Sequence, residues 1–116
     1  MNDPEAIADI LNTYKKHGWI LRRVLLSRPA GAAAPELPGD QFSGAEIRDS
    51  DMDALWFSRV SRPNTEAWEL RALSAAPFAL LEVIPDDTSE ADRETILSGV
   101  EDRMREMVIR GRTKDN

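Results

Sequence analysis

The sequence predicts an α+β domain, with an antiparallel four- to five-stranded sheet and an N-terminal and a C-terminal helix packed on one face. Apolar residues recur at helical spacing near both ends of the chain, whereas the middle contains short apolar segments of strand length. Residues that favour turns separate those segments. The 116 residues are 41% hydrophobic and 31% charged, so we expect residues 1–116 to form a single α+β domain.

The N-terminal helix is predicted over residues 3–17. Asn2 or Asp3 can cap its start, and Gly18 stands where a left-handed C-terminal cap belongs. One helical face collects the apolar residues Ile7, Ile10, Leu11 and Tyr14. His17, the only histidine, is expected to interact with the last carbonyl groups of the helix rather than to serve in a catalytic triad.

An apolar segment from Trp19 to Ser27 predicts the first strand, because nine residues between a glycine and a proline suit a strand better than a helix. Residues 28–41 contain three prolines and two glycines, so we expect a mobile surface loop. Such a loop can act as a lid, but its alanines and prolines supply no chemistry, and a plain connection is the favoured interpretation.

Four further strands and a helix are predicted in the remainder of the chain. The strands lie near 45–49, 54–61, 66–73 and 78–84, with turns at Pro63–Asn64 and at 74–77. The helix spans about 88–110 and can be capped by Asp87 with Glu90, or by Thr88 or Ser89. Gly111 is expected to end it, and residues 112–116 to form a frayed tail.

Turn geometry predicts how these strands pair. A two-residue turn at Pro63–Asn64 makes Phe57 face Leu70, and the next turn makes Leu70 face Leu81. One side of the sheet then becomes apolar and is expected to lie beneath both helices; its residues are Leu55, Phe57, Trp68, Leu70, Ala72, Ala79, Leu81 and Val83. Arg59 would lie over Trp68 at the rim as a cation–π pair.

The opposite side of the predicted sheet has no helix left to cover it. Its aromatic, aliphatic and charged residues form a surface of the kind that marks an interaction site. The predicted partner-binding residues are Trp56, Arg71, Phe78, Leu80, Glu69 and Glu82. We therefore expect a non-enzymatic binding, adaptor or chaperone-like domain that uses this outer face for a protein partner or for a homodimer. The alternative is a small ligand-binding protein or enzyme that uses the arginine and glutamate residues of the same face.

Asp49, Asp51 and Asp53 alternate in a pattern that can begin a metal site. An EF-hand loop starting at Asp49 would need glycine where Ala54 stands and glutamate where Val60 stands, so that motif fails. Like charges at this spacing repel, and aspartate is poor in strands. The favoured interpretation is a turn or bulge before a strand, and no metal or other cofactor is expected.

Glu69 and Glu82 lie opposite each other in the predicted register. Two neighbouring carboxylates can act as acid and base, but a surface ladder bridged by arginine is the favoured interpretation. The sequence also lacks a nucleophile elbow, a phosphate loop and a dinucleotide fingerprint, so no catalytic residue is assigned. Met104 and Met107 are expected in the core, with a methionine-rich binding groove as the alternative.

Composition limits the classes of partner and of cellular location that we expect. The chain has a formal charge of −6 and no basic segment, which argues against nucleic acid. No apolar run approaches the roughly 20 residues of a membrane helix, and the N-terminus is unlike a signal peptide. The absence of cysteine fits a cytoplasmic location. Residues 17–84 contain seven arginines and no lysine, so a local anion site is open, although paired surface charges are commoner.

Overall fold

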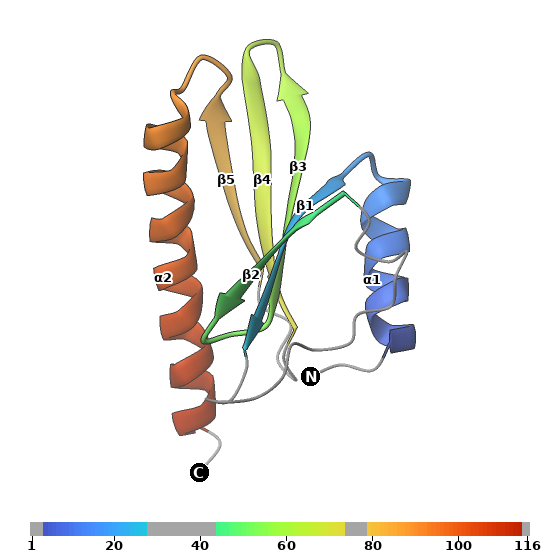
Figure 1. The fold of residues 1–116 in the computed structure, drawn as a ribbon, viewed down its shortest axis with the longest axis vertical. Helices are drawn as coiled ribbons and strands as arrows, with labels where there is room; N and C mark the ends of the chain where they lie inside the picture. Colours follow the sequence, from blue (N-terminus) through green and yellow to red (C-terminus); the bar gives the residue numbers. More distant parts are fainter. Residues whose placement is uncertain (1–3, 28–43, 74–78, 115–116) are drawn as a thin grey trace.

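The computed structural model describes residues 4–27, 44–73 and 79–114 (Figure 1). The elements follow in the order α1 (Pro4–Lys16), β1 (Ile20–Ser27), β2 (Glu46–Ser50), β3 (Ala54–Arg62), β4 (Thr65–Ala72), β5 (Ala79–Pro85) and α2 (Glu90–Lys114). The predicted α+β order of helices and strands is confirmed. The predicted loop at 28–41 lies outside the described residues.

The five strands form one sheet in the order β2-β1-β3-β4-β5. The β1–β3, β3–β4 and β4–β5 pairs are antiparallel, whereas β1 and β2 are parallel, so the prediction of a purely antiparallel sheet is corrected. Two parallel strands need a crossover of a dozen or more residues. The long connection between Ser27 and Glu46 meets that requirement.

The two helices pack against opposite faces of the sheet, which we call the α1 side and the α2 side (Figure 1). The α2-side core contains Trp56, Trp68, Leu70, Leu97, Val100 and Met104. The α1-side core contains Ile7, Tyr14, Val24, Leu55 and Phe57. Leu55 and Trp56 are consecutive in β3 and therefore point to opposite faces. The expectation that both helices cover one face is corrected accordingly.

A one-residue register shift explains why the predicted apolar face combined residues that lie on opposite faces of the sheet. Arg62 pairs with Thr65 around the predicted Pro63–Asn64 turn, where Asn64 is left-handed with φ 70°. A bulge between Val60 and Arg62 then shifts the ladder, so Phe57 faces Glu69 instead of Leu70. Because side chains alternate along a strand, one extra residue in β3 makes every β3 side chain before the bulge point to the opposite face of the sheet from the one predicted relative to β4.

The β4–β5 pairing differs from the prediction by one residue as well. Leu70 faces Leu80, and Glu69 faces Leu81. Leu80 and Ile84 therefore contact the α2-side core, whereas Leu81 and Val83 are exposed on the α1 side. The prediction that Leu81 and Val83 lie beneath a helix is wrong.

Two of the helix termini that the structure describes follow local capping rules. Gly18 has φ 86°, and the amides of Gly18 and Trp19 donate to carbonyl groups of the last turn of α1, as predicted. Ser89 Oγ accepts from the amide of Asp92 and caps α2. Helix α2 continues past Gly111 to Lys114, which corrects its predicted end.

A glycine stops a helix when it takes up the left-handed conformation. Among the glycines that the structure describes, Gly18 and Gly44 have positive φ.

Within the described ranges, no helix is both long enough and apolar enough to span a membrane.

Candidate functional site

The six residues predicted to bind a partner do not form one surface. Trp56, Leu80 and Glu82 lie on the α2 side, and Glu69 and Arg71 lie on the α1 side. Phe78 lies outside the described residues. Trp56 is completely buried, so it does not form the centre of an exposed docking surface.

Trp56 is instead a central part of the α2-side core. Its indole Nε1 donates a hydrogen bond of 2.8 Å to Glu101 Oε2. Its ring meets Trp68 edge-on, with the ring centroids 6.0 Å apart. Arg22 lies 5.6 Å from the centre of the Trp68 ring, the position that was predicted for Arg59.

Glu69 and Glu82 cannot share a proton, because the sheet separates them. Glu82 lies beneath α2, where Arg103 approaches its Oε1 at 3.5 Å. Glu69 accepts a hydrogen bond from the Tyr14 hydroxyl on the α1 side. The proposed acid–base pair is therefore not formed.

The alternating aspartates contact different partners. Asp51 Oδ1 forms an ion pair of 2.6 Å with Arg105 of α2. Asp53 Oδ1 accepts from the amide of Ser27, at 2.8 Å, and from the Ser27 hydroxyl. Asp51 and Asp53 thus connect the segment before β3 to α2 and to the end of β1. Within the described residues, no group of three His, Cys, Asp or Glu side chains is placed to hold a metal ion.

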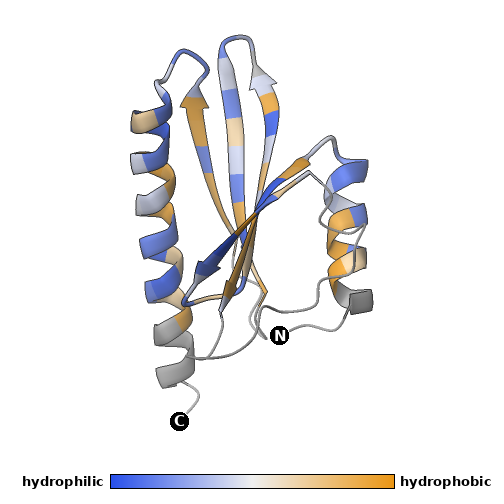
Figure 2. Cartoon of the chain, viewed as in Figure 1, coloured by the Kyte–Doolittle hydropathy of each residue, from blue (hydrophilic) through white to orange (hydrophobic). Residues whose placement is uncertain are grey.

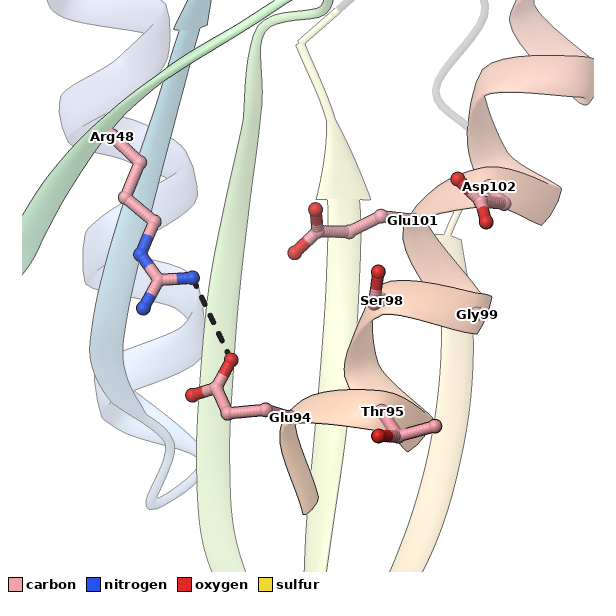
Figure 3. Close-up of a pocket in the computed structure, with 7 residues that line it drawn as sticks. All are labelled: Arg48, Glu94, Thr95, Ser98, Gly99, Glu101 and Asp102. Carbon is pink, nitrogen blue, oxygen red and sulfur yellow. Dashed lines mark ion pairs between the residues drawn. The ribbon is translucent and has the colours of Figure 1, made fainter. Parts of the chain in front are cut away.

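A groove of about 540 Å³ lies between β2 and α2 (Figure 3). It is lined by Arg48, Glu94, Thr95, Ser98, Gly99, Glu101 and Asp102. Every charged residue of this lining has a protein partner: Arg48 pairs with Glu46 and Glu94, Glu101 accepts from Trp56, and Asp102 pairs with Arg105. The charged side chains of the groove are therefore used to connect β2 to α2 through ion pairs.

A second pocket, of about 280 Å³, opens at the C-terminal end of α1. We call it the Tyr14 pocket; its lining residues are Thr13, Tyr14, His17, Trp19, Glu69 and Arg71. Tyr14 stacks on Phe57, with the ring centroids 3.9 Å apart, and its hydroxyl contacts both Glu69 and Arg71. The pocket thus combines aromatic walls with one guanidinium and one carboxylate.

Burial raises the pKa of Tyr14 to about 12, and its hydrogen bond to Glu69 contributes in the same direction. Arg71 opposes this rise in pKa, because a positive charge favours the tyrosinate. The phenol is therefore neutral at physiological pH and acts as a hydrogen-bond donor to Glu69. Arg71 Nε is buried without a hydrogen-bond acceptor.

Helix α1 leaves part of its side of the sheet open. Its core cluster involves β1 and β3, whereas the α1-side residues of β5 are exposed. Leu81 retains 58% of its accessible surface and Val83 retains 50%. We call Ala79, Leu81 and Val83 the β5 strip. It adjoins the Tyr14 pocket, because Leu81 pairs directly with Glu69.

Sequence reasoning missed both features of the α1 side. Tyr14 was assigned only to the helix core, and Trp19 only to a strand. Arg59, which was expected over Trp68, lies 4.7 Å from the centre of the Trp19 ring and donates to the carbonyl of His17. The usable signal was the pair of consecutive apolar runs in β1 and β3, which indicates burial on both faces of the sheet.

Neither feature can be assigned by likeness to another protein. Leu81 and Val83 present an aliphatic surface, and the Tyr14 pocket presents Arg71 between aromatic walls. Comparison with models of protein families, with curated proteins and with solved structures gives no significant match.

Proposed function

We propose that this protein is a non-enzymatic binding domain that associates with a second copy of itself through β5. The observation that carries the proposal is the β5 strip, where Leu81 and Val83 are largely exposed on an edge strand. An edge strand presents unpaired backbone N–H and C=O groups, and exposed apolar side chains beside them favour pairing with another strand.

The two edges of the sheet differ in a way that supports this choice (Figure 2). β2 is five residues long and contains Glu46, Arg48 and Asp49, so its edge is charged. β5 is seven residues long and has one charged residue, Glu82. Charges and short length protect an edge strand from pairing, and β5, which is longer and has a single charge, has less of this protection than β2.

Two-fold symmetry suggests a specific register. A two-fold axis perpendicular to the sheet makes the two β5 strands antiparallel and keeps both copies of α1 on the same side. An axis through Leu81 places Leu81 opposite Leu81 of the second copy and Val83 opposite Ala79 of the second copy. An axis through Glu82 would place two glutamates opposite each other, which is unfavourable. We therefore propose the axis at Leu81.

Light scattering coupled to size exclusion tests the interface. The wild-type chain, of 13.0 kDa, is expected to show twice this mass at high concentration. Leu81→Glu is expected to give the monomer mass, because it would bury two carboxylates at the axis. Ile20→Glu is the matched control, since Ile20 is 59% exposed on β1, and should leave the dimer intact.

A wild-type monomer at every concentration would refute self-association and leave the strip to a different protein. A dimer that Leu81→Glu and Ile20→Glu affect equally would refute β5 as the interface. Circular dichroism of each variant establishes that its fold is retained.

Single cysteines test the register, because the natural chain contains none. Directly opposite residues have Cβ atoms about 4.5–5.5 Å apart, close to disulfide geometry. Leu81→Cys is therefore expected to form a cross-linked dimer under mild oxidation, and Val83→Cys is not. Cross-linking of Glu82→Cys in preference to Leu81→Cys would move the axis and contradict the proposed register.

A further inference from the structure

We propose that the Tyr14 pocket binds a carboxylate group through Arg71. This site is separate from the proposed dimer interface, although the two adjoin. The pocket provides room for a small acid or for the terminal residue of a peptide, since its 280 Å³ correspond to roughly nine water volumes of about 30 Å³.

Arg71 supplies the recognition. A guanidinium carries five N–H donors in a fixed planar arrangement that matches the two oxygens of a carboxylate. Tyr14 Oη takes one interaction with Arg71, and Arg71 Nε is buried without an acceptor. A buried donor without a partner raises the free energy of the unliganded protein. An anion that reorients the guanidinium and satisfies this donor should therefore bind more tightly than the same anion at an exposed arginine.

Tyr14 and Glu69 hold Arg71 in place without neutralising it directly. The Tyr14 hydroxyl donates to Glu69, so its oxygen lone pairs are left to face Arg71. The phenol lies between the carboxylate and the guanidinium and remains neutral. The Arg71 guanidinium is therefore available to an arriving anion in a pocket that is partly shielded from water, where charge–charge attraction is stronger than at the surface.

The aromatic walls favour a planar acid. Tyr14 and Trp19 meet edge-on, with their ring centroids 6.1 Å apart, and both line the pocket. The imidazole of His17 lies at the exposed rim and adds a third ring to the pocket lining. An aromatic carboxylate can place its ring against these walls while its oxygens reach Arg71. A neutral molecule of the same shape would use the walls alone.

Benzoate and benzamide separate these contributions, because they have the same shape and differ in charge. The measurement is the ¹H–¹⁵N indole signal of Trp19, assigned by its loss in Trp19→Phe. Benzoate at constant ionic strength is expected to shift this signal saturably. Benzamide is expected to bind at least about tenfold more weakly, as the loss of a charge-assisted hydrogen bond predicts.

Arg71→Gln is expected to reduce the benzoate affinity to that of benzamide, whereas Arg71→Lys should retain part of it. Arg22→Gln is the matched control, because Arg22 lies over Trp68 on the α2 side and should bind benzoate as the wild type does. The same spectra report whether each variant is folded.

A second arm distinguishes the source of the carboxylate. An N-acetylated dipeptide ending in phenylalanine with a free carboxylate is compared with its C-terminal amide. Tighter binding of the free acid than of benzoate indicates a peptide terminus, and tighter binding of benzoate indicates a free small acid. Equal binding of benzoate and benzamide, no shift with either, or equal effects of Arg71→Gln and Arg22→Gln would overturn the proposal.

Discussion

At the scale of single residues, Tyr14 contacts both the apolar core and the polar groups of the α1 side, although its place in the sequence predicts only a core residue of a helix. Its ring stacks on Phe57 in the core, and its hydroxyl reaches Glu69 and Arg71 of β4. One side chain thus joins helix packing to a polar pocket. This is possible because tyrosine has an apolar body and a polar tip.

The ionisation of Tyr14 can be measured directly, because it is the only tyrosine in the chain. We expect tyrosinate absorbance in the folded protein to rise with a midpoint near pH 12, against 10.0 for an ordinary tyrosine. A pKa raised by folding stabilises the native state fully below pH 10, and this contribution is lost as the pH rises towards 12. Glu69→Gln should lower the midpoint. A folded-state midpoint at pH 10 would contradict the described contacts.

Trp56 and Trp68 provide a matched pair for testing a buried hydrogen bond. Trp56 Nε1 donates to Glu101, whereas Trp68 Nε1 is buried without a partner. Trp56→Phe removes a satisfied donor, and Trp68→Phe removes an unsatisfied one. We expect Trp56→Phe to lower the free energy of unfolding by about 1–3 kcal/mol more than Trp68→Phe does, as measured by urea denaturation. Equal losses would indicate that packing alone decides both effects.

At the scale of elements, ionic contacts join helix α2 to β2 and to the turn that follows it. Arg48 reaches Glu94, and Arg105 reaches both Asp51 and Asp102 (Figure 3 shows the first of these pairs). Beneath them, Arg23 is largely buried and contacts Glu46 and Glu94. Helix α2 packs against β4 and β5, and these ionic contacts connect it to β2, at the other edge of the sheet.

The Asp51–Arg105 pair predicts a small, pH-dependent effect. Arg105 holds the pKa of Asp51 below its usual 3.8, so the pair stabilises the fold above pH 3.8 and this contribution is lost as the pH falls through the lowered pKa. Because Asp51 is exposed, Asp51→Asn should cost at most about 1 kcal/mol at pH 7, and salt should reduce that cost.

Thermal denaturation of Asp51→Asn and wild type at neutral and strongly acidic pH checks this expectation. Asp86→Asn, in the turn before α2, serves as the control. A stability difference between Asp51→Asn and wild type that persists unchanged in strong acid would exclude the ion pair as its cause.

At the scale of the whole molecule, the sheet carries a core on each face. The buried side chains of β3 alternate between the α1-side and α2-side clusters, so a side chain on either face supports the same strand. We expect the two cores to unfold together, because neither helix can be removed without exposing one face of the central strands.

Ile7 and Leu97 test this cooperativity from the two sides. Both are almost completely buried, Ile7 in the α1-side core and Leu97 in the α2-side core. Ile7→Ala and Leu97→Ala are each expected to lower stability by about 2–5 kcal/mol while unfolding remains a single transition. Coincident urea curves by circular dichroism and tryptophan fluorescence would support this. Separate transitions in Ile7→Ala would show that α1 unfolds independently.

The candidate surfaces were only partly predictable from sequence. Glu69 and Arg71 were correctly expected to share a face, because they stand two residues apart in a strand. That Tyr14 would contact Glu69, 55 residues away along the chain, and with it Arg71 was not predictable, because no local pattern specifies where α1 crosses the sheet. The exposed position of Leu81 was mistaken for a buried one, because its face depends on two registers.

The sequence by itself determined the order of helices and strands, the Pro63–Asn64 turn and the cap at Gly18, because each depends on side-chain periodicity or on the backbone preference of one residue. Only the tertiary structure decided which face each strand presents, that the helices lie on opposite sides, and that the α1 side of β5 is left exposed. A single bulge beside Ser61 reverses the faces of β3 relative to β4, and nothing local to Ser61 marks it. Such a bulge is chosen by the packing of the whole sheet, since its benefit lies in bringing Trp56 beneath α2 and Phe57 beneath α1.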